Sequence, residues 1–456
     1  MAKQRSAEFR ALVADAAAHF QAGRLAEAES AYRMALAIIP ADPGLTHNLG
    51  ISIAAQGHHR AAVACFDEAL KADPSFASAH HNRAVALMRL GRTHEAIEAF
   101  SRAAALEPQH YEAHRALGFL WLSQGERGRA LDHFARTYEL RRGDDRTSIA
   151  LKSLTTATRD KLEHDAEQFH YLSQRTRDHL RFDLLARSYG EIAKQVPNEV
   201  TALSEAQIEA LGEGYNTSIH LRAAPEVAQR AVTERDDRAA LEAQFEEQGV
   251  IVVDDLLTPP ALESLQRFLL ESTIWHDFSH IDGFVASYLE DGLASPLLLQ
   301  VADELRSAFP RILGEHSLSQ AWAFKGLRAQ AAVDVHADDA AVSVNFWATP
   351  TEANLNPGSG GLVVCRTPPP GDWQIKDYDA DRERIVTFLE QNAVNCLVVP
   401  YRENRAAVFR SRLFHHSDRP EFALGYENHR INLTLLYGEG DLRKAQNPFP
   451  SALFQN

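Results

Sequence analysis

Cysteine is scarce in this chain, and the three cysteines that occur are far apart. Cys65, Cys365 and Cys396 form no Cys-x-x-Cys pair. Their spacing excludes a framework of disulfides and a zinc site built from paired thiolates, and it favours a reducing compartment. Long hydrophobic runs are also missing: no stretch approaches the roughly 20 apolar residues of a membrane-spanning helix, and the N-terminus lacks the apolar core of a secretory signal. We therefore expect a cytoplasmic protein that does not enter a membrane.

The chain also carries no excess of positive charge. The 456 residues contain 47 Lys and Arg against 62 Asp and Glu, a net charge of −15 at pH 7. Proteins that bind nucleic acid through its phosphates carry basic surfaces, so we expect no nucleic-acid partner. Hydrophobic residues make up 45% of the chain, which is typical of a globular protein with a sizeable core. At this length the chain is expected to fold as two or three domains.

The first third of the chain repeats with a period of 34 residues. Four columns follow this step: Gly23, Gly57, Gly91 and Gly125; Ala28, Ala62, Ala96 and Ala130; Tyr32, Phe66, Phe100 and Phe134; and Pro40, Pro74 and Pro108. The glycine ends the first helix of a pair, the alanine lets the second helix approach, the aromatic side chain fills the space between repeats, and the proline ends the second helix. The pattern resembles the tetratricopeptide repeat (TPR) and predicts an α-helical TPR solenoid of four repeats over residues 9–142.

Such arrays present a concave surface that binds extended peptides. The residues expected to face inward are His47, Asn48, His81, Asn82, His114 and Arg115. Asn48 and Asn82 hold the same place in successive repeats, which resembles the asparagine ladder of peptide-binding TPR proteins, where each amide both donates to and accepts from a peptide backbone. The alternative is a pair of solvated asparagines on a helix face. Residues 143–235 lack the period but keep apolar residues at helical spacing, which predicts a helical linker region.

From Gly249 onward the pattern changes to short β-rich segments. Strands are expected at residues 250–253, 321–326, 333–348, 361–365, 396–400, 406–409 and 430–437, and helices at 261–270 and 296–309. Many short strands bounded by glycine, proline and asparagine predict a double-stranded β-helix (jelly roll) with flanking helices over residues 236–456. The expected protein is therefore multidomain, with α-helical and β parts in series.

Two His-x-Asp triplets lie in this last third, one at residues 280–282 and one formed by His336 and Asp338. Alternate residues of a strand point the same way, so both side chains of a triplet can face one centre. We favour His336 and Asp338 because they lie at the start of an expected strand, whereas the surroundings of 280–282 do not alternate. A third ligand is available downstream at His415 or His416. Two histidines and one carboxylate are the set that holds non-haem Fe(II) while leaving positions open for substrate and O₂.

This arrangement resembles the Fe(II)/2-oxoglutarate-dependent oxygenases, whose motif is HxD…H followed by a basic residue. The resemblance implies that the favoured triplet and His415 bind Fe(II); a Leu-Phe pair precedes His415 as in the family, which favours it over His416. It also implies that Arg430 binds the distal carboxylate of the cosubstrate 2-oxoglutarate, with Asn432 as a polar partner where many members have Ser or Thr. O₂ would be the oxidant.

Lys325, Arg328 and Asn345 are further candidates for the lining of the pocket. Because Asp338 fills the acidic position, the resemblance implies hydroxylation rather than halogenation. TPR repeats upstream of such a domain resemble the architecture of hydroxylases that act on polypeptides. We therefore expect a dioxygenase that hydroxylates a side chain of a protein or peptide held in the TPR groove. The alternatives are a hydroxylase of a small molecule, such as an amino acid or metabolite, whose array docks a partner, and a non-catalytic TPR scaffold.

Overall fold

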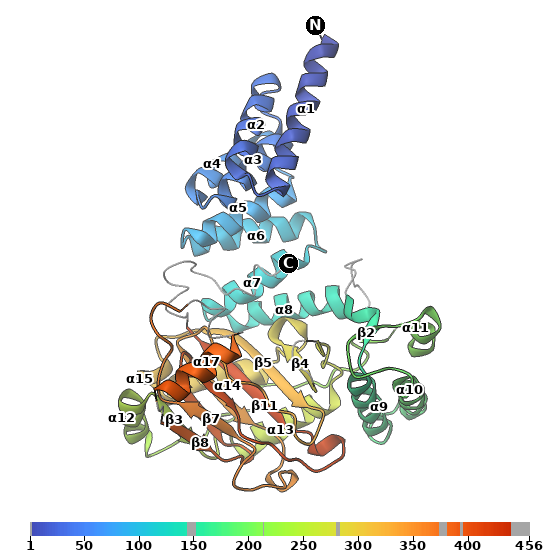
Figure 1. The fold of residues 1–456 in the computed structure, drawn as a ribbon, viewed down its shortest axis with the longest axis vertical. Helices are drawn as coiled ribbons and strands as arrows, with labels where there is room; N and C mark the ends of the chain where they lie inside the picture. The colour runs from blue at the N-terminus through green and yellow to red at the C-terminus, as the bar shows by residue number, and fades with distance from the viewer. Residues whose placement is uncertain are drawn as a thin grey trace. The chain divides into compact units, whose positions relative to one another are not determined.

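The computed structural model describes residues 2–143, 152–212, 214–279, 283–373, 381–392 and 395–438. By their contacts the residues form two compact units, the first ending at Leu120 and the second beginning at Trp121. The first unit is a helical array and the second contains a β-rich region, drawn in yellow to red in Figure 1. Within the described residues, no helix combines the length and the apolar composition that crossing a membrane requires.

The N-terminal array is a series of antiparallel helix pairs. Its helices are α1 (Ala2–Gln21), α2 (Leu25–Ile38), α3 (Pro43–Ala55), α4 (His59–Ala72), α5 (Ala77–Arg89), α6 (Thr93–Leu106), α7 (Tyr111–Ser123) and α8 (Arg127–Arg142). The four glycines of the repeat column have φ between 70° and 82°, the left-handed conformation that glycine adopts at little cost. The four alanines are completely buried, and the four aromatic side chains are at most 5% exposed. The predicted array of TPR repeats is confirmed.

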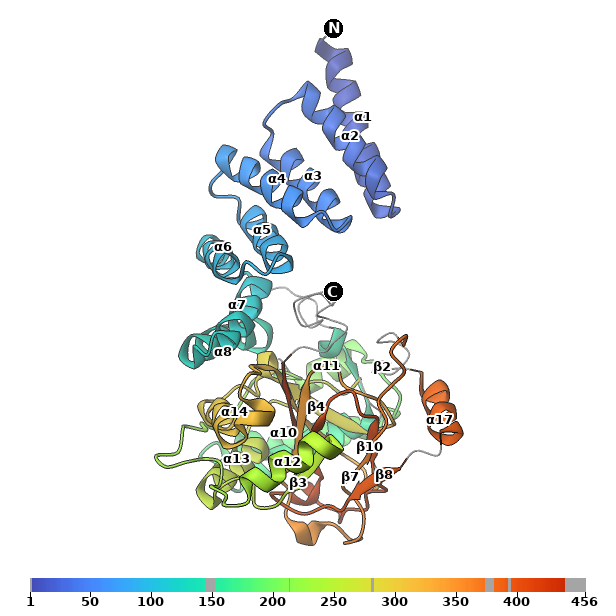
Figure 2. The ribbon, with the colours of Figure 1, turned by 90° about the vertical axis from the view of Figure 1, so that its left-hand side faces the viewer.

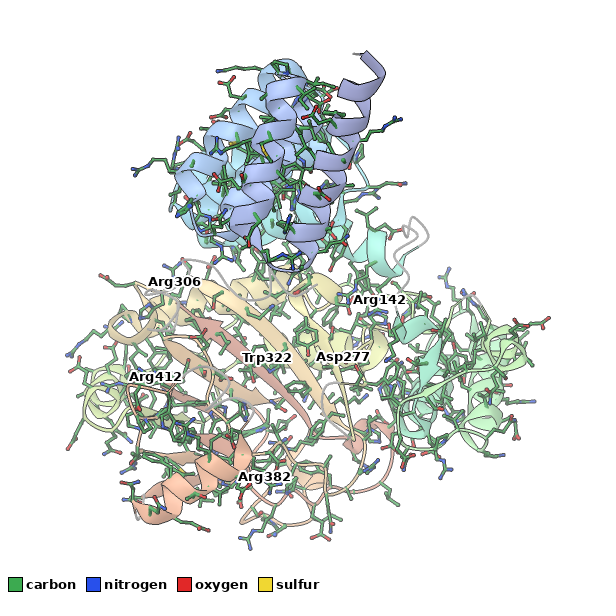
Figure 3. The ribbon with its side chains drawn as sticks, turned by 45° about the horizontal axis from the view of Figure 1, so that its top comes forward. Arg142, Asp277, Arg306, Trp322, Arg382 and Arg412 are labelled. Carbon is green, nitrogen blue, oxygen red and sulfur yellow. A yellow bond between two sulfur atoms is a disulfide. The ribbon has the colours of Figure 1, made fainter. Side chains whose placement is uncertain are left out.

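Helix α8 is anchored in the second unit, although in the sequence it is the last helix of the repeat array. Near its end, Arg142 donates from Nε and Nη2 to the two carboxylate oxygens of Asp291, at 3.0 and 3.1 Å. Both residues are 2% exposed. Tyr138, one turn earlier, donates its hydroxyl to the carbonyl of Thr273 (3.3 Å). A buried ion pair therefore fixes the end of this helix; Figure 3 labels Arg142.

The described part of the predicted linker region is mainly helical. It comprises η1 (Lys152–Leu154), β1 (Thr156–Ala157), α9 (Arg159–Ser173), α10 (His179–Ala193), β2 (Thr201–Ala202) and α11 (Glu205–Leu211). Helices α9 and α10 pack around a small core of their own that includes Phe169, Phe182 and Tyr189. Gln168 on α9 donates to the carbonyl of Ser272 (2.8 Å), so this region also contacts the β-rich region directly.

Two antiparallel sheets form the β-rich region. Its elements are α12 (Arg238–Gln248), β3 (Val250–Val253), α13 (Pro259–Glu271), β4 (Phe284–Tyr288), η2 (Leu289–Asp291), α14 (Pro296–Ala308), α15 (Pro310–Leu313), β5 (Leu318–Gly326), β6 (Val342–Trp347), η3 (Thr351–Ala353), β7 (Leu362–Cys365), α17 (Arg382–Gln391), β8 (Cys396–Val399), β9 (Ala406–Arg410), β10 (His415–Ser417), η4 (Tyr426–Asn428) and β11 (Ile431–Tyr437). The larger sheet has the order β3-β9-β6-β11-β5-β4 and the smaller one the order β10-β7-β8. Neither sheet closes on itself among the described strands.

The two sheets pack face to face. Their shared core contains Val250, Trp347 and Phe409 from the larger sheet and Leu362, Val364 and Val399 from the smaller sheet. Helix α17 lies on the other face of the smaller sheet (Figure 2). Its Ile385 packs there with Val363 and Phe414. On the larger sheet, Tyr437 of β11 donates to the carbonyl of Ala302 on α14 (2.9 Å). Helices therefore flank both sheets on the sides that face away from the shared core.

The strand predicted at residues 333–348 is shorter than expected, since β6 begins only at Val342. Upstream of it, His336 pairs with His415 through two backbone hydrogen bonds of 3.0 and 2.8 Å. The backbone N–H of Ala341, five residues later, donates instead to the carbonyl of Tyr437. The chain thus crosses from the smaller sheet to the larger one within these residues, and the crossing interrupts the regular strand.

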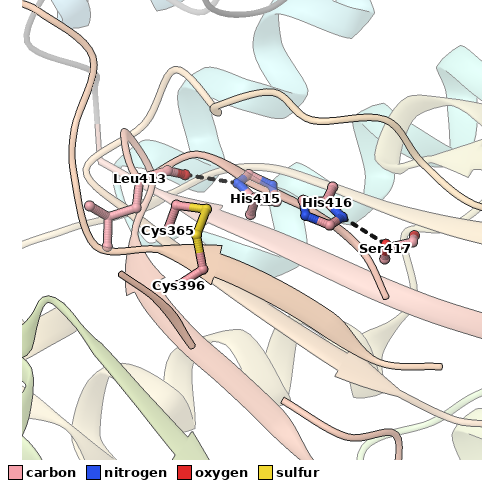
Figure 4. Close-up of a disulfide and its surroundings, with 6 residues drawn as sticks. All are labelled: Cys365, Cys396, Leu413, His415, His416 and Ser417. Carbon is pink, nitrogen blue, oxygen red and sulfur yellow. Dashed lines mark hydrogen bonds between the residues drawn. A yellow bond between two sulfur atoms is a disulfide. The ribbon is translucent and has the colours of Figure 1, made fainter. Parts of the chain in front are cut away.

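Two of the three cysteines form a disulfide, contrary to the expectation from their spacing. Cys365 on β7 and Cys396 on β8 lie directly opposite each other in the strand register and are joined through their sulfur atoms (Figure 4). The pairing of these strands brings together residues that are 31 positions apart. The cysteine pattern therefore gives no argument for a reducing compartment.

Candidate metal centre and anion pocket

The structure brings His336, Asp338 and His415 together. Each offers one ligand atom, and these atoms lie within 4.8 Å of one another. Nε2 of His336 is 3.8 Å from Oδ1 of Asp338, and Nε2 of His415 is 3.6 Å from Oδ2. Two imidazoles and one carboxylate meet here from two places in the chain, the triplet that begins at His336 and the segment that contains His415. The donor types suit non-haem Fe(II).

Backbone carbonyls fix the two imidazole rings. Nδ1 of His336 lies 2.8 Å from the carbonyl oxygen of Asp334, and Nδ1 of His415 lies 3.0 Å from that of Leu413 (Figure 4). A proton held on each Nδ1 leaves each Nε2 as the metal-binding atom. Burial, and then the charge of His336, lower the pKa of His415 to about 4. At neutral pH the ring of His415 is therefore in the neutral form that binds a metal.

Serine hydroxyls orient the carboxylate of Asp338. Ser343 on β6 donates to Oδ2 of Asp338 (2.7 Å), and the hydroxyls of Ser343 and Ser411 are 2.8 Å apart. All three side chains are buried. The sequence pattern did not reveal either serine. Ser343 could have been found from its place two residues before Asn345 on an expected strand. Alternate residues of a strand share a face, so the side chain of Ser343 is expected on the same face as that of Asn345.

His415, not His416, belongs to the candidate metal centre. Along β10, His415 and Ser417 are buried while His416 between them is partly exposed. Successive residues of a strand point to opposite faces, which separates the two histidine rings. Nδ1 of His416 lies 2.8 Å from the carbonyl oxygen of Ser417. The competing triplet at residues 280–282 lies outside the described residues.

A pocket of about 750 Å³ adjoins the three candidate ligands and contains the guanidinium of Arg430. Nε and Nη2 of Arg430 donate to the carbonyls of Gly360 (3.0 Å) and Gly361 (3.1 Å), whereas Nη1 is buried and finds no hydrogen-bond partner in the described part of the chain. Burial lowers the pKa of Arg430 to about 10, so the group remains charged at neutral pH. A buried cation with an unused N–H is suited to binding an anion.

Polar side chains follow Arg430 on the same face of β11. Asn432 and Thr434 are the next residues of this face, and Nδ2 of Asn345 donates to Oγ1 of Thr434 (3.0 Å). The amide oxygens of Asn345 and Asn432 are buried and have no partner among the residues described. Asn345 lines the pocket, as expected from the sequence.

Lys325 and Arg328 do not line this pocket, contrary to the expectation from the sequence. Lys325 alternates with Phe324 on β5 and points to the other face of the sheet, where Nζ lies 3.5 Å from the ring centroid of Tyr426. Arg328 forms an ion pair with Asp160 (2.6 Å). Neighbouring residues of a strand point to opposite faces, so Lys325 faces away from the pocket that Phe324 lines. The sequence did not show which face of β5 would turn inward.

Aromatic residues form the part of the pocket wall that lies beside Asn432 and Thr434 on the larger sheet. Tyr288 on β4 and Trp322 on β5 are direct neighbours in the register, and Phe324 follows on the same face. The Tyr288 hydroxyl donates to Oδ2 of Asp277 (3.1 Å), which ties this ring in place. Figure 3 labels Trp322 and Asp277. The sequence did not predict this wall because no strand was expected at β4.

The two asparagines of the proposed ladder lie in the first unit, Asn48 on α3 and Asn82 on α5. Both are partly buried. Nδ2 of Asn82 lies 2.9 Å from Nε2 of His47, so the amide of Asn82 already has one partner within the array.

Comparison with known proteins supports the repeats. The family described as Tetratricopeptide repeat matches residues 47–106 and 81–145. No curated protein matches the chain. The presence of TPR repeats indicates a role in protein interaction or as a scaffold.

Solved structures that are similar to part of this chain include three proteins. A mutant O-GlcNAc transferase of Thermobaculum terrenum is 26% identical (29% of this chain, 27% of that chain, TM-score 0.27). MamA of MSR-1 is 25% identical (29% and 76%, TM-score 0.27). The first TPR of Spaghetti (RPAP3), bound to an HSP90 peptide, is 22% identical (26% and 95%, TM-score 0.26). This chain spans about a quarter of the transferase, and none of these likenesses extends over the whole chain.

Proposed function

We propose that this protein is an Fe(II)/2-oxoglutarate-dependent oxygenase that hydroxylates a side chain of a protein or peptide bound by the TPR array. One observation carries the proposal: two histidines and a carboxylate with ligand atoms within 4.8 Å share a pocket with the buried cation of Arg430. The donor set matches non-haem Fe(II), and the unused N–H of Arg430 matches the distal carboxylate of 2-oxoglutarate.

The order of the strands supports a double-stranded β-helix for the second unit. After β5 of the larger sheet, the segment around His336 pairs with β10 of the smaller sheet, and β6 then returns to the larger one. Strands β7 and β8 belong to the smaller sheet, β9 to the larger, β10 to the smaller and β11 to the larger. This alternation between two facing sheets supports the jelly-roll arrangement proposed from the sequence.

Each residue of the site has a distinct part in this proposal. Fe(II) with 2-oxoglutarate and O₂ supplies the oxidising chemistry of C–H hydroxylation, which side chains alone do not provide. His336, Asp338 and His415 hold the metal, and Ser343 keeps the carboxylate of Asp338 oriented. Arg430 and Asn432 hold the cosubstrate, while the aromatic wall shields the reacting group from water.

The experiment that tests the metal centre compares two neighbouring histidines. His415→Ala removes a proposed ligand, whereas His416→Ala removes a neighbouring ring that also borders the pocket but does not belong to the three-residue ligand cluster. Conversion of 2-oxoglutarate to succinate with added Fe(II) is measured for both variants, together with Fe(II) binding. We expect loss of both in His415→Ala and retained metal binding in His416→Ala. Equal turnover by His415→Ala and the wild type would exclude the proposed metal centre.

A small-molecule substrate is the second candidate, and the pocket volume of about 750 Å³ favours it, since that is the size of typical small-molecule sites. The double variant Asn48→Ala/Asn82→Ala separates the two. If the array presents a polypeptide, this variant captures less peptide and oxidises less of it, measured as the mass gain of one oxygen atom, but still consumes 2-oxoglutarate. Unchanged oxidation of every substrate would favour the small-molecule alternative.

A further inference from the structure

We propose that the turn formed by Ser359, Gly360 and Gly361 positions Arg430, so that only the end-on edge of its guanidinium is available to an anionic ligand, and that Asn354 is the positioning residue that holds this turn. The inference rests on the proposed function in one respect, namely that the ligand is 2-oxoglutarate. The geometry of the turn and its hydrogen bonds stand without that assumption.

The guanidinium of Arg430 has two edges that can bind a carboxylate with paired N–H groups. The side edge consists of Nε and Nη2, and the end edge of Nη1 and Nη2. Nε donates to Gly360 and Nη2 to Gly361, so consecutive backbone carbonyls occupy the side edge. Nη1 is the buried nitrogen that has no partner within the described ranges. A carboxylate that enters the pocket therefore meets the end edge.

The same turn is tied to the strand that carries His415. The N–H of Gly360 donates to the carbonyl of Asp418 (2.6 Å), and the N–H of Asp418 donates back to the carbonyl of Gly361 (3.2 Å). The hydroxyl of Ser359 donates to the same Asp418 carbonyl (3.1 Å). Asp418 directly follows β10, so the carbonyl of Gly361 accepts from both that strand end and Arg430. The turn thus sets the anion-binding group relative to the candidate metal ligand.

Only glycine fits at the two positions that bind Arg430. Gly360 has φ of +81°, a conformation that other residues rarely adopt. A Cβ atom at Gly361 would lie 2.0 Å from the carbonyl oxygen of Val399, which is backbone and cannot rotate away. The close approach between this turn and the end of β8 is therefore built into the fold.

Asn354 holds the turn from outside the pocket. Its side chain is 6% exposed and does not line the pocket. Nδ2 donates to the carbonyls of Ser359 (3.1 Å) and Asn356 (2.9 Å), and Oδ1 accepts from the N–H of Asn356 (3.2 Å). Without these bonds the turn keeps its ties to Asp418 but loses its support on the side of Asn354, so the two glycine carbonyls restrain the guanidinium less firmly.

The variant Asn354→Ala should therefore weaken anion binding without touching the ligand. We expect the KM for 2-oxoglutarate to rise about tenfold with little change in kcat, because the lost interaction serves binding in the ground state and the transition state alike. Glutarate is a dicarboxylate of the same length as 2-oxoglutarate but without the keto group. We expect the metal-free variant to bind glutarate about tenfold more weakly than the metal-free wild type does, as measured by titration calorimetry. Ser359→Ala, which removes a single hydroxyl, is the second variant and should have a smaller effect of the same kind.

A matched control is the buried Asn404, which holds a different turn. Its Nδ2 donates to the carbonyl of Leu257 and its Oδ1 accepts from the N–H of Leu257, both at 2.8 Å. Asn404→Ala should lower stability but leave glutarate affinity unchanged. Wild-type affinity for glutarate in Asn354→Ala and Ser359→Ala, with affinity lost in Arg430→Ala, would overturn the positioning role. If glutarate binding depends on Arg430 and Asn354 but the wild type converts no 2-oxoglutarate, the positioning role stands and the proposed oxygenase function falls.

Discussion

The helical array and the β-rich region encode their architecture in different ways. In the array, residues 34 positions apart have the same structural role and the same degree of burial. The four alanines of the repeat column, for example, are all completely buried. In the β-rich region, the residues of the pocket come from β4, β5, β6, β7, α17, β10, β11 and the loops between them, and no spacing repeats. A local period can be read from the sequence, whereas a site assembled from distant strands depends on which strands pair.

Glycine shows the contrast most plainly. A Cβ atom added to Gly57 would meet no described atom within 4 Å, so the residue is needed for its φ of +82° alone. Gly361 has no such φ requirement, but its missing side chain makes room for the backbone of β8. The first role is a property of one helix end, and the second is a property of two strands that meet only in the folded protein.

The largest effect is expected at Arg142, which lies in a repeat helix by sequence and in the second unit by contacts. Asp291 is deeply buried, which would raise its pKa, but Arg141 and Arg142 hold the pKa of this carboxyl below its usual range. Arg142→Ala removes both hydrogen bonds from the guanidinium to the buried carboxylate of Asp291. This variant should destabilise the second unit by about 3–5 kcal/mol, measured by denaturant unfolding. The exposed pair of Arg33 and Glu29 is the control, where Arg33→Ala should cost less than about 1 kcal/mol. Equal losses would mean that α8 behaves as an ordinary repeat helix.

The first unit should lose stability in mild acid. The ring of His81 stacks on that of His110 at 4.8 Å, and burial followed by the charge of His110 lower the pKa of His81 to about 4. Because this is below the ordinary value of 6.5, the unfolded chain takes up the proton first; stability is complete above pH 6.5 and falls between pH 6.5 and 4. The loss amounts to at most about 3 kcal/mol.

His81→Gln removes the titrating ring and tests this assignment. Hydrogen exchange of α5 and α6, followed from pH 7 to pH 4, should show a flatter stability profile in the variant than in the wild type. The same pH dependence in both proteins would assign the acid sensitivity to another histidine of the array.

The site should be sensitive to a serine that no repeat column and no motif marks. Ser343→Ala removes the hydrogen bond to Oδ2 of Asp338 and should weaken Fe(II) or Mn(II) binding by about 10–100-fold, measured by metal titration. Ser319, whose hydroxyl donates to the carbonyl of Leu436 on the same sheet, is the control and should leave metal affinity unchanged when replaced by alanine. Unaltered metal binding in Ser343→Ala would show that the carboxylate needs no such support.

The smallest effect is expected at the repeat glycines. Gly57→Ala forces alanine into a left-handed conformation without any clash, so the array should lose about 1–2 kcal/mol. Gly44→Ala, in the first turn of α3 with an ordinary contact to Asp42, should stabilise the same repeat by about 0.5–1 kcal/mol. Thermal unfolding of the two variants should therefore shift in opposite directions; a shift in the same direction would contradict the conformational explanation.

The sequence predicted the array down to individual residues because each column acts within one helix pair. It also selected His336, Asp338 and His415, since the chemistry of metal ligands restricts the residue types so strongly that few combinations were open. It failed where the answer depended on facing strands. Lys325 was a candidate for the pocket lining but lies on the other face, the aromatic wall at Tyr288 and Trp322 was not predicted, and Cys365 was not paired with Cys396.

The sequence by itself therefore determined the repeated helical array, and it indicated the change to β structure after Gly249 and the residue types of the candidate metal ligands. The tertiary structure alone decided which histidine of the adjacent pair turns inward, which serine supports the carboxylate and which edge of Arg430 stays open. The physical reason is the range of the interactions involved. Helix ends and repeat contacts are satisfied by residues close in the chain, while strand register, close backbone approach and shared burial are settled only when distant segments meet.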